Sequence, residues 1–221
     1  MKTWKQNAFL GLLTIMVLAF IFTACDNGNG KTDPVYKEVL ARSEAYKANG
    51  ELSSYGEYEY DSKGNRTKMI SHNSNGELTG YSEYEYDSKG NRTKANSHNS
   101  NGELIGYSEY EYDSKGNQIK ESPYDKNGEL NIYFEYEYDS QGNMTKQSLY
   151  IANEELLSYA EYEHDSKGNR TKAISYNANG ELSSSGKYEH DSKGNLTKES
   201  WYNENGELNS YTIYTYKVIM L

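Results

Sequence analysis

Paired carboxylates are the first residues of this sequence that could do chemistry. Glu57 and Glu59 stand two residues apart, so in a strand both would project from one face, as general acid–base catalysis would require. At 26-residue steps the first glutamate recurs in five of six copies and the second in all six. Catalysis needs a singular, desolvated site, whereas these carboxylates are spread along a surface. We therefore expect a solvated acidic face and a protein that is not an enzyme.

Metal binding is the second chemistry to consider. The segment Asp61-Ser62-Lys63-Gly64-Asn65 loosely resembles a calcium loop, but it contains a lysine and too few carboxylates to hold the ion. Four histidines stand at positions where other copies have tyrosine, so we interpret them as replacements for tyrosine: His72, His98, His164 and His190. The sequence predicts no metal site and no cofactor.

Tyrosine is the third candidate, because it recurs with the same period and exposed rings can stack on sugars. The possible binding face consists of Tyr58, Tyr84, Tyr110, Tyr136, Tyr162 and Tyr188. The chain has 24 tyrosines and a mean hydropathy of -1.00, so aliphatic core residues are scarce. We expect these rings to serve first as core, with a binding surface as the alternative.

The repeat that carries these residues contains two turn signals. In the first unit they are Asp61-Ser62-Lys63-Gly64 and Asn73-Ser74-Asn75-Gly76, in which Asp or Asn caps the turn and Gly supplies a positive φ. This pattern predicts three-residue hairpin loops. The turn glycines of the first three units are Gly64, Gly76, Gly90, Gly102, Gly116 and Gly128. Glu154 replaces the equivalent glycine later in the chain, so that junction is expected to need another turn.

Two turns per unit predict an all-β fold of tandem 26-residue hairpins. We expect about 14 strands in a twisted antiparallel meander, open or curled. The turn type sets a register in which Tyr60 faces Arg66 and Tyr58 faces Lys68. All even-numbered residues would then share one face. Pro123 would remove one hydrogen-bond donor from its ladder.

The first 25 residues differ from the rest of the chain. Lys2 and Lys5 precede an apolar run from Phe9 to Phe22, which is typical of a secretory signal peptide. Phe22-Thr23-Ala24-Cys25 resembles the lipobox of bacterial lipoproteins, although Leu is commoner at the first position. The resemblance implies cleavage before Cys25 and its lipidation, with an ordinary signal peptide as the alternative. Because more than one acyl chain anchors stably, the expected partner is a membrane.

Charge excludes one class of partner. Loss of Lys2 and Lys5 with the signal changes the net charge from -10 to -12. Affinity for nucleic acid comes mostly from cations on phosphates, so we expect no nucleic-acid binding. The single cysteine means that disulfides play no part.

The unit Tyr-x-Tyr-Asp-x-x-Gly-Asn, followed by Thr67-Lys68 and a second Asn-Gly turn, resembles the YD repeat of Rhs-type bacterial proteins over residues 50–216. That resemblance implies a β-meander that curls into a shell, and some members of the family are described as sugar-binding. The period here is longer, no toxin domain follows, and the array is too short to enclose a protein. The Asn-Gly-Glu-Leu turns are more weakly similar to variant MORN repeats. A closed membrane barrel is disfavoured by the lysine in every unit.

Together these features divide the chain into five parts. They are a signal peptide (1–24), the lipidated cysteine and a flexible tether (25–34), a degenerate repeat or cap (35–49), six repeats (50–206) and a C-terminal capping strand (207–221). A helix over 35–49 is an alternative. The expected function is that of a non-catalytic lipoprotein of the bacterial cell envelope, periplasmic or on the outer surface, that binds glycan, matrix or another envelope protein. The alternative is a structural spacer without a specific ligand.

Overall fold

The structure is a computed structural model that describes residues 35–221, in which all regular elements are β-strands. In chain order they are β1 (Tyr36–Lys47), β2 (Leu52–Tyr60), β3 (Arg66–Asn73), β4 (Leu78–Tyr86), β5 (Arg92–Asn99), β6 (Leu104–Tyr112), β7 (Gln118–Asp125), β8 (Ile132–Tyr138), β9 (Met144–Ile151), β10 (Leu156–His164), β11 (Arg170–Asn177), β12 (Leu182–His190), β13 (Leu196–Asn203) and β14 (Leu208–Met220). The predicted signal peptide, Cys25 and tether lie outside these residues. No helix in the described part of the chain is long and apolar enough to cross a membrane.

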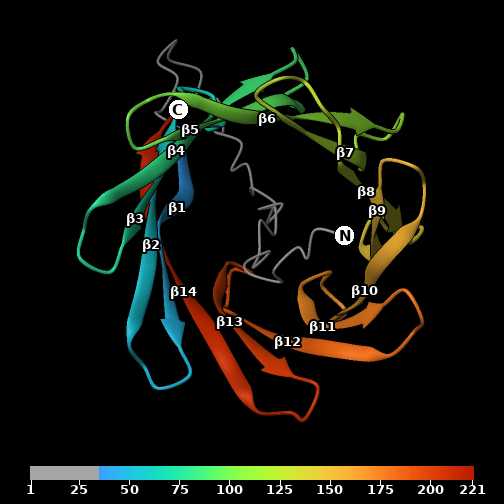
Figure 1. Cartoon of the computed structure of the whole chain (residues 1–221). Helices are drawn as coiled ribbons and strands as arrows, with labels where there is room; N and C mark the ends of the chain where they lie inside the picture. The colour runs from blue at the N-terminus through green and yellow to red at the C-terminus, as the bar shows by residue number, and fades with distance from the viewer. Residues whose placement is uncertain (1–34) are drawn as a thin grey trace.

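The fourteen strands form one antiparallel meander that closes into a barrel (Figure 1). The meander is as predicted, but the expectation of an open or curled sheet is wrong. Closure depends on β1, which pairs with β14 in register from Tyr36↔Met220 to Lys47↔Ser210. The alternative of a helix over 35–49 is therefore wrong, and the capping strand β14 is itself covered by β1. Closure leaves no unpaired edge strand.

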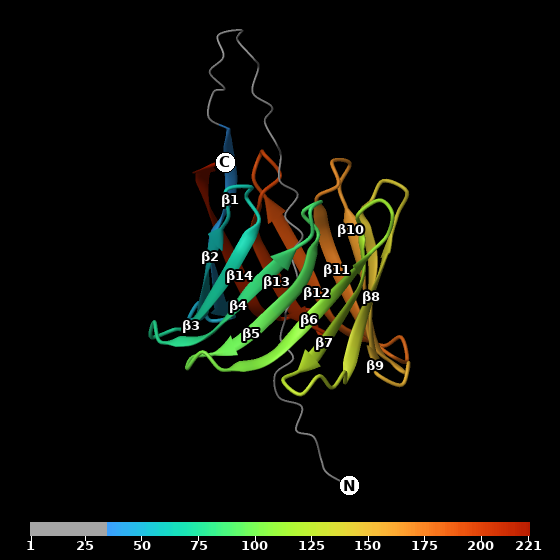
Figure 2. The same cartoon turned by 90° about the horizontal axis from the view of Figure 1, so that it is seen from above.

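Two sets of turns occupy the two ends of the barrel (Figure 2). At the Asp turns, Asp61 N–H donates to Asn65 O at 2.9 Å, and Asp61 Oδ1 accepts from the Lys63 and Asn65 N–H groups. Asn73 makes the same contacts in the Asn turns. The six glycines named above have φ between 77° and 87°, a region that side chains with a Cβ rarely adopt. The C-terminus lies at the Asp-turn end.

Glu154 occupies the same turn as the glycines. Its N–H donates to Ile151 O at 2.9 Å, Ile151 N–H donates to Glu155 O at 3.0 Å, and its φ is 71°. The expectation of a different turn at this junction is wrong, because the flanking strands hold the loop geometry and force Glu154 into the left-handed region.

Replacing Glu154 with glycine is expected to stabilise the protein by about 1 kcal/mol, because the left-handed conformation costs an L-residue about that much. Urea unfolding of the full chain measures the change, and hydrogen exchange around residues 148–158 should slow. Glu155→Gly is the matched control, since Glu155 has no positive φ and should lose stability. A Glu154→Gly variant that is less stable than the parent would contradict this account.

The predicted register is correct at the turn and wrong beyond it. Tyr60 pairs with Arg66, but the next pair is Glu59↔Lys68, so a β-bulge at Thr67 inserts one residue. Tyr58 consequently pairs with Met69 instead of Lys68, and Lys68 lies on the opposite face from Tyr58. A second bulge in the β3–β4 hairpin, between Ser71↔Gly80 and His72↔Leu78, restores the parity. The predicted face of even-numbered residues thus holds along the even-numbered strands, whereas in β3 it holds for Arg66 and is lost after the bulge.

The outer surface is formed by stacked aromatic pairs, cations and carboxylates. Six pairs of rings stack across neighbouring strands with centroids 4.6–5.1 Å apart: Tyr46–Tyr211, Tyr55–His72, Tyr81–His98, Tyr107–Tyr124, Tyr133–Tyr150 and Tyr159–Tyr176. Lys68 Nζ lies 4.0 Å from the centre of the Tyr81 ring and 3.2 Å from Glu83 Oε1. Both faces of Tyr81 are thus covered, one by His98 and one by Lys68. These pairs stabilise the sheet and leave few open ring faces.

The β7–β8 pairing is the shortest in the barrel. It consists of Lys120↔Glu135 and Glu121↔Phe134, with an isolated bridge between Tyr124 and Leu130. Pro123 lies in this part of β7, where it has no N–H to donate. The ladder is therefore interrupted next to Pro123.

Candidate functional site in the barrel lumen

Seven tyrosines, one from each even-numbered strand, face the lumen at the same level. We call them the tyrosine ring: Tyr58, Tyr84, Tyr110, Tyr136, Tyr162, Tyr188 and Tyr214. Six are the tyrosines that the sequence singles out, and the structure brings them together inside the barrel. Tyr58 is only 7% exposed. The seventh, Tyr214, was missed, although it lies one 26-residue step after Tyr188.

Some of the ring hydroxyls bond to a side chain fifteen residues earlier, on the preceding strand. The hydroxyl of Tyr58 lies 2.7 Å from Ser43 Oγ, and that of Tyr162 donates to Gln147 Oε1 at 2.7 Å. Tyr136 donates to Glu121 Oε2 at 3.1 Å. Tyr214 is similarly placed against Glu199, and burial together with that carboxylate raises the pKa of Tyr214 far above its ordinary value. An acceptor on the odd-numbered strand thus satisfies these hydroxyls.

The other three ring tyrosines have an apolar residue at that position, and an arginine lies nearby instead. These tyrosines are Tyr84, Tyr110 and Tyr188. The arginines that stand eighteen residues before them are Arg66, Arg92 and Arg170, in that order. Each arginine also lies over the ring of the tyrosine eight residues before it in the sequence. For Arg170, the guanidinium carbon is 4.0 Å from the Tyr162 ring centre and 5.5 Å from that of Tyr188.

The two arrangements exclude each other. Where a unit has an arginine, the residue three positions later is Met69, Ala95 or Ala173. The other units have Leu40, Gln118, Met144 or Leu196 at the arginine position. Three positions later these units have, in the same order, Ser43, Glu121, Gln147 or Glu199. Each unit therefore contributes either a cation or an acceptor to the lumen. The three arginines are not spread evenly around the ring.

Arg92 shows the electrostatics of the lumen. Burial lowers its pKa, but Tyr110, Tyr86 and Tyr84 more than offset that effect and raise it. Its Nε is buried and, like that of Arg66, has no hydrogen-bond partner within residues 35–221. Burial also raises the pKa of Tyr112 to about 12. The lumen therefore holds permanent cations beside neutral hydroxyl groups.

A second row of tyrosines ties the units together. The hydroxyl of Tyr86 donates to Arg66 O at 2.7 Å, and Tyr60, Tyr112, Tyr138 and Tyr216 make the same bond to the carbonyl twenty residues earlier. His164 and His190 occupy this position in two units, where burial is the main cause that lowers the pKa of both. His72 and His98 stack on the outer surface. No group of residues that could hold a metal occurs in the described part of the chain.

Two adjoining cavities lie in the lumen. The one toward the Asp turns has a volume of about 300 Å³ and is lined by the three arginines, Gln118 and Gln147. The other, of about 420 Å³, is lined by ring tyrosines, Thr212 and Glu199. Arg66 and Arg92 border both. Guanidinium and amide donors beside aromatic rings can bind the hydroxyl or anionic groups of a small polar molecule.

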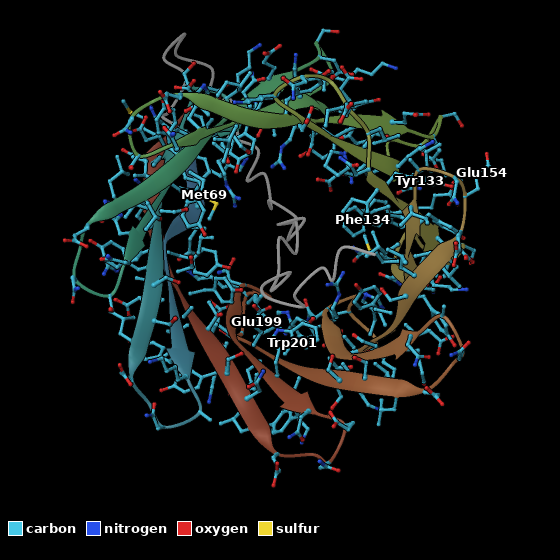
Figure 3. All side chains as sticks on the ribbon, viewed as in Figure 1. Met69, Tyr133, Phe134, Glu154, Glu199 and Trp201 are labelled. Carbon is cyan, nitrogen blue, oxygen red and sulfur yellow. The ribbon has the colours of Figure 1, made fainter. Side chains whose placement is uncertain are left out.

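Sequence reasoning missed the two lumenal carboxylates. Glu121 is 4% exposed and Glu199 is 8% exposed, and Figure 3 shows Glu199 directed inward, beside Trp201. Their signal was a departure within the repeat, because other units have Met69, Ala95 or Ala173 there. The exposed pairs such as Glu57 and Glu59 recur in the units and face outward.

Comparisons with family models and with curated proteins gave no match. Among solved structures, the chain is similar to a porin-like protein from Bacteroides uniformis, with 12% identity and a TM-score of 0.44 over 80% of this chain and 98% of that one. It is also similar to an exported protein with a YmcC-like fold from Bacteroides fragilis (12% identity, TM-score 0.32, 81% and 95% covered). A third likeness is to the Photorhabdus luminescens Tc holotoxin pore (16% identity, TM-score 0.30), of which only 9% is covered, with 80% of this chain. Likenesses this distant carry no function.

Proposed function

We propose that this protein is a non-catalytic lipoprotein of the bacterial cell envelope that binds a small saccharide in its barrel lumen. The observation that carries the proposal is the tyrosine ring with Arg66, Arg92 and Arg170 set between its members. Aromatic faces can stack on a sugar ring, and guanidinium groups donate hydrogen bonds to its hydroxyl or carboxylate oxygens. The resemblance to YD-repeat proteins, some of which are described as sugar-binding, agrees with this ligand class.

Cavity size restricts the ligand. Small-molecule sites commonly occupy about 300–1,000 Å³, and the two cavities have volumes of about 300 and 420 Å³. A mono- or disaccharide, or the end of a longer glycan, is the size that such a lumen admits. The outer tyrosines are poorer candidates, because stacked partners and cations cover their faces.

A binding test compares one kind of unit with the other. Arg92→Met with Ala95→Gln copies the pair Met144 and Gln147, so it removes a lumenal cation while giving Tyr110 the acceptor that Tyr162 has. We expect the full chain to bind saccharides on a glycan array and the double variant to bind at least tenfold more weakly. Lys89→Gln, at an exposed turn, is the control and should bind normally. Undiminished binding by the double variant would place the site elsewhere.

The second candidate is a structural spacer, which one observation favours. Neighbouring units are held together without any ligand, both by the hydrogen bond from the Tyr86 hydroxyl and its equivalents and by the stacked aromatic rings of the outer surface. If the protein binds no saccharide on the glycan array, this result would support the spacer function and rule out the saccharide-binding function.

The lipid anchor fits the geometry of the barrel. Leu221 N–H donates to Val35 O at 2.8 Å, so the point where the tether would join lies beside the C-terminus, at the Asp-turn end. Nine residues lie between Cys25 and Val35, and the ten Cα–Cα steps from one to the other span at most about 35 Å. In this arrangement the Asp-turn end faces the membrane and the charged outer surface stands in water.

Cys25→Ser is expected to block lipidation and move the protein from the detergent phase to the aqueous phase of a detergent partition. The lipid thioether forms only on the cysteine thiol, which serine lacks. Ser43→Ala, within the barrel, is the control and should stay in the detergent phase. A wild-type protein already found in the aqueous phase would show that the chain carries no lipid.

A further inference from the structure

One segment of the lumen departs from the repeat twice within three residues. Trp201 stands where other units have Ser71, Ser97, Pro123, Leu149 and Ser175. Across the strands it pairs with Gly186, where a Cβ would approach the indole ring to 3.2 Å. The indole also meets the Tyr188 ring edge-on at 6.3 Å. Because Gly186 has no side chain, it leaves the space that the indole ring of Trp201 occupies.

The carboxylate of Glu199 lies beside this indole. Its Oε2 is buried and has neither a hydrogen-bond partner nor an ion pair among residues 35–221. The hydroxyl of Tyr188 is likewise buried and unpartnered in the described residues, because Ala173 stands where Ser43 or Gln147 forms a hydrogen bond in other units. Glu121 differs from Glu199, since neither of its carboxylate oxygens is among the buried atoms that lack a partner in residues 35–221. An unpaired buried oxygen of this kind costs free energy that a suitable donor would offset.

Glu199, one of these two residues, borders a space that can hold a ligand. Glu199, Thr212 and Tyr214 line the cavity of about 420 Å³, and Figure 3 shows Glu199 and Trp201 side by side at the inner surface of the barrel. A group that enters here meets a carboxylate oxygen and several aromatic rings together. That combination selects a cation that can also donate hydrogen bonds.

We propose that Glu199, with Trp201, Tyr188 and Tyr214, forms a subsite for a protonated primary amine, so that the saccharide is an amino sugar with a free amine. The proposal rests on the proposed function, because it assumes that a saccharide occupies the lumen. The ammonium donates to Glu199 Oε2 and lies against the rings. Arg66 and Arg92 border both cavities, so hydroxyl groups of the same ligand reach guanidinium donors.

A competing interpretation is that Glu199 is protonated and donates to a neutral ligand. Burial raises the pKa of Glu199, while Tyr214, Trp201, Arg170 and Thr212 act in the opposite direction. An amine and a neutral hydroxyl separate the two cases, because an ionised carboxylate attracts an ammonium by its charge in addition to accepting a hydrogen bond.

The test uses Trp201 as its own reporter. In the full chain with Trp4→Phe, Trp201 is the single tryptophan. Its emission is titrated with glucosamine, N-acetylglucosamine and glucose at about pH 6.5, where an aliphatic amine of this kind is protonated. We expect glucosamine to bind at least tenfold more tightly than the two neutral sugars. Glu199→Gln should reduce that preference to less than about twofold, because the amide carries no charge to attract the ammonium.

The fold should tolerate Glu199→Gln, because Gln147 stands at the equivalent position. Glu121→Gln is the matched control, since Glu121 already accepts from Tyr136, and it should keep the preference for glucosamine. Equal binding of glucosamine and glucose, or a preference that survives Glu199→Gln, overturns the subsite and leaves saccharide binding intact. Binding of none of the three sugars overturns both proposals.

Discussion

Deletion of residues 36–47 is expected to open the closed barrel and to make the chains associate through the strands that lose a partner. Without β1, the strands β2 and β14 each lose a partner and expose a row of unpaired backbone groups. The deletion also removes Val39 and Leu40, each 3% exposed, from a barrel with few aliphatic core residues. Size-exclusion chromatography and thermal unfolding measure the result: larger species and loss of a single cooperative transition.

Two point variants separate the effect of opening the barrel from the effect of losing buried apolar side chains. Leu40→Ala keeps the β1–β14 pairing, so it should remain monomeric and lose about 2–5 kcal/mol. Ile105→Ala, at a site that is 54% exposed, should change stability by less than about 0.5 kcal/mol. A deletion variant that stays monomeric and unfolds cooperatively would mean that closure by β1 is dispensable.

Replacing the aspartate of each of the six Asp turns with asparagine is expected to reduce the loss of folding stability at low pH. In Asp113, hydrogen bonds from the Asn117 side chain and backbone N–H lower the pKa of the carboxyl. The folded-state pKa is depressed, so the stabilisation is present above the unfolded pKa of about 4 and is lost as pH falls through the lower folded value. The pKa is lowered in all six turns, at Asp61, Asp87, Asp113, Asp139, Asp165 and Asp191.

Urea unfolding of the sixfold Asp→Asn variant at neutral pH and at about pH 3 measures the effect. Because Asn73 makes the same two backbone contacts as Asp61, the variant should fold normally at neutral pH and keep more of its stability in acid. A control changes six exposed glutamates, beginning with Glu59 and Glu111, to glutamine, which alters the charge equally and leaves the turns intact. An equal gain in the control would assign the effect to net charge.

Local chemistry made the turns and strands predictable from the sequence. Asp61 and Gly64 determine a hairpin loop within five residues, and the constant period repeats that result along the chain. The same reasoning missed the bulge at Thr67, because an extra residue in a ladder depends on how two strands twist against each other. That single residue moved Lys68 from the Tyr58 ring to the Tyr81 ring.

Closure and the lumen could not be predicted for a different reason. Closure depends on pairing between β1 and β14, which are far apart in sequence, and the periodic pattern is weakest in β1. The lumenal groups depend on departures from the repeat, such as Glu199 and Trp201, which averaging over units hides. The sequence groups the six tyrosines on one face, but only closure of the barrel turns that face inward.

Each 26-residue unit contributes two adjacent strands, and the barrel is closed by β1 and β14 alone. The segments Tyr84–Asn91 and Tyr110–Asn117 have the same amino-acid sequence, and recombination between the stretches of gene that encode them would gain or lose a whole unit and keep every turn and the seam intact. Because the diameter of a barrel grows with strand number, the lumen would widen or narrow in fixed steps. A lineage carrying this gene could therefore change the calibre of the lumen by copy number, before any lumenal residue is substituted.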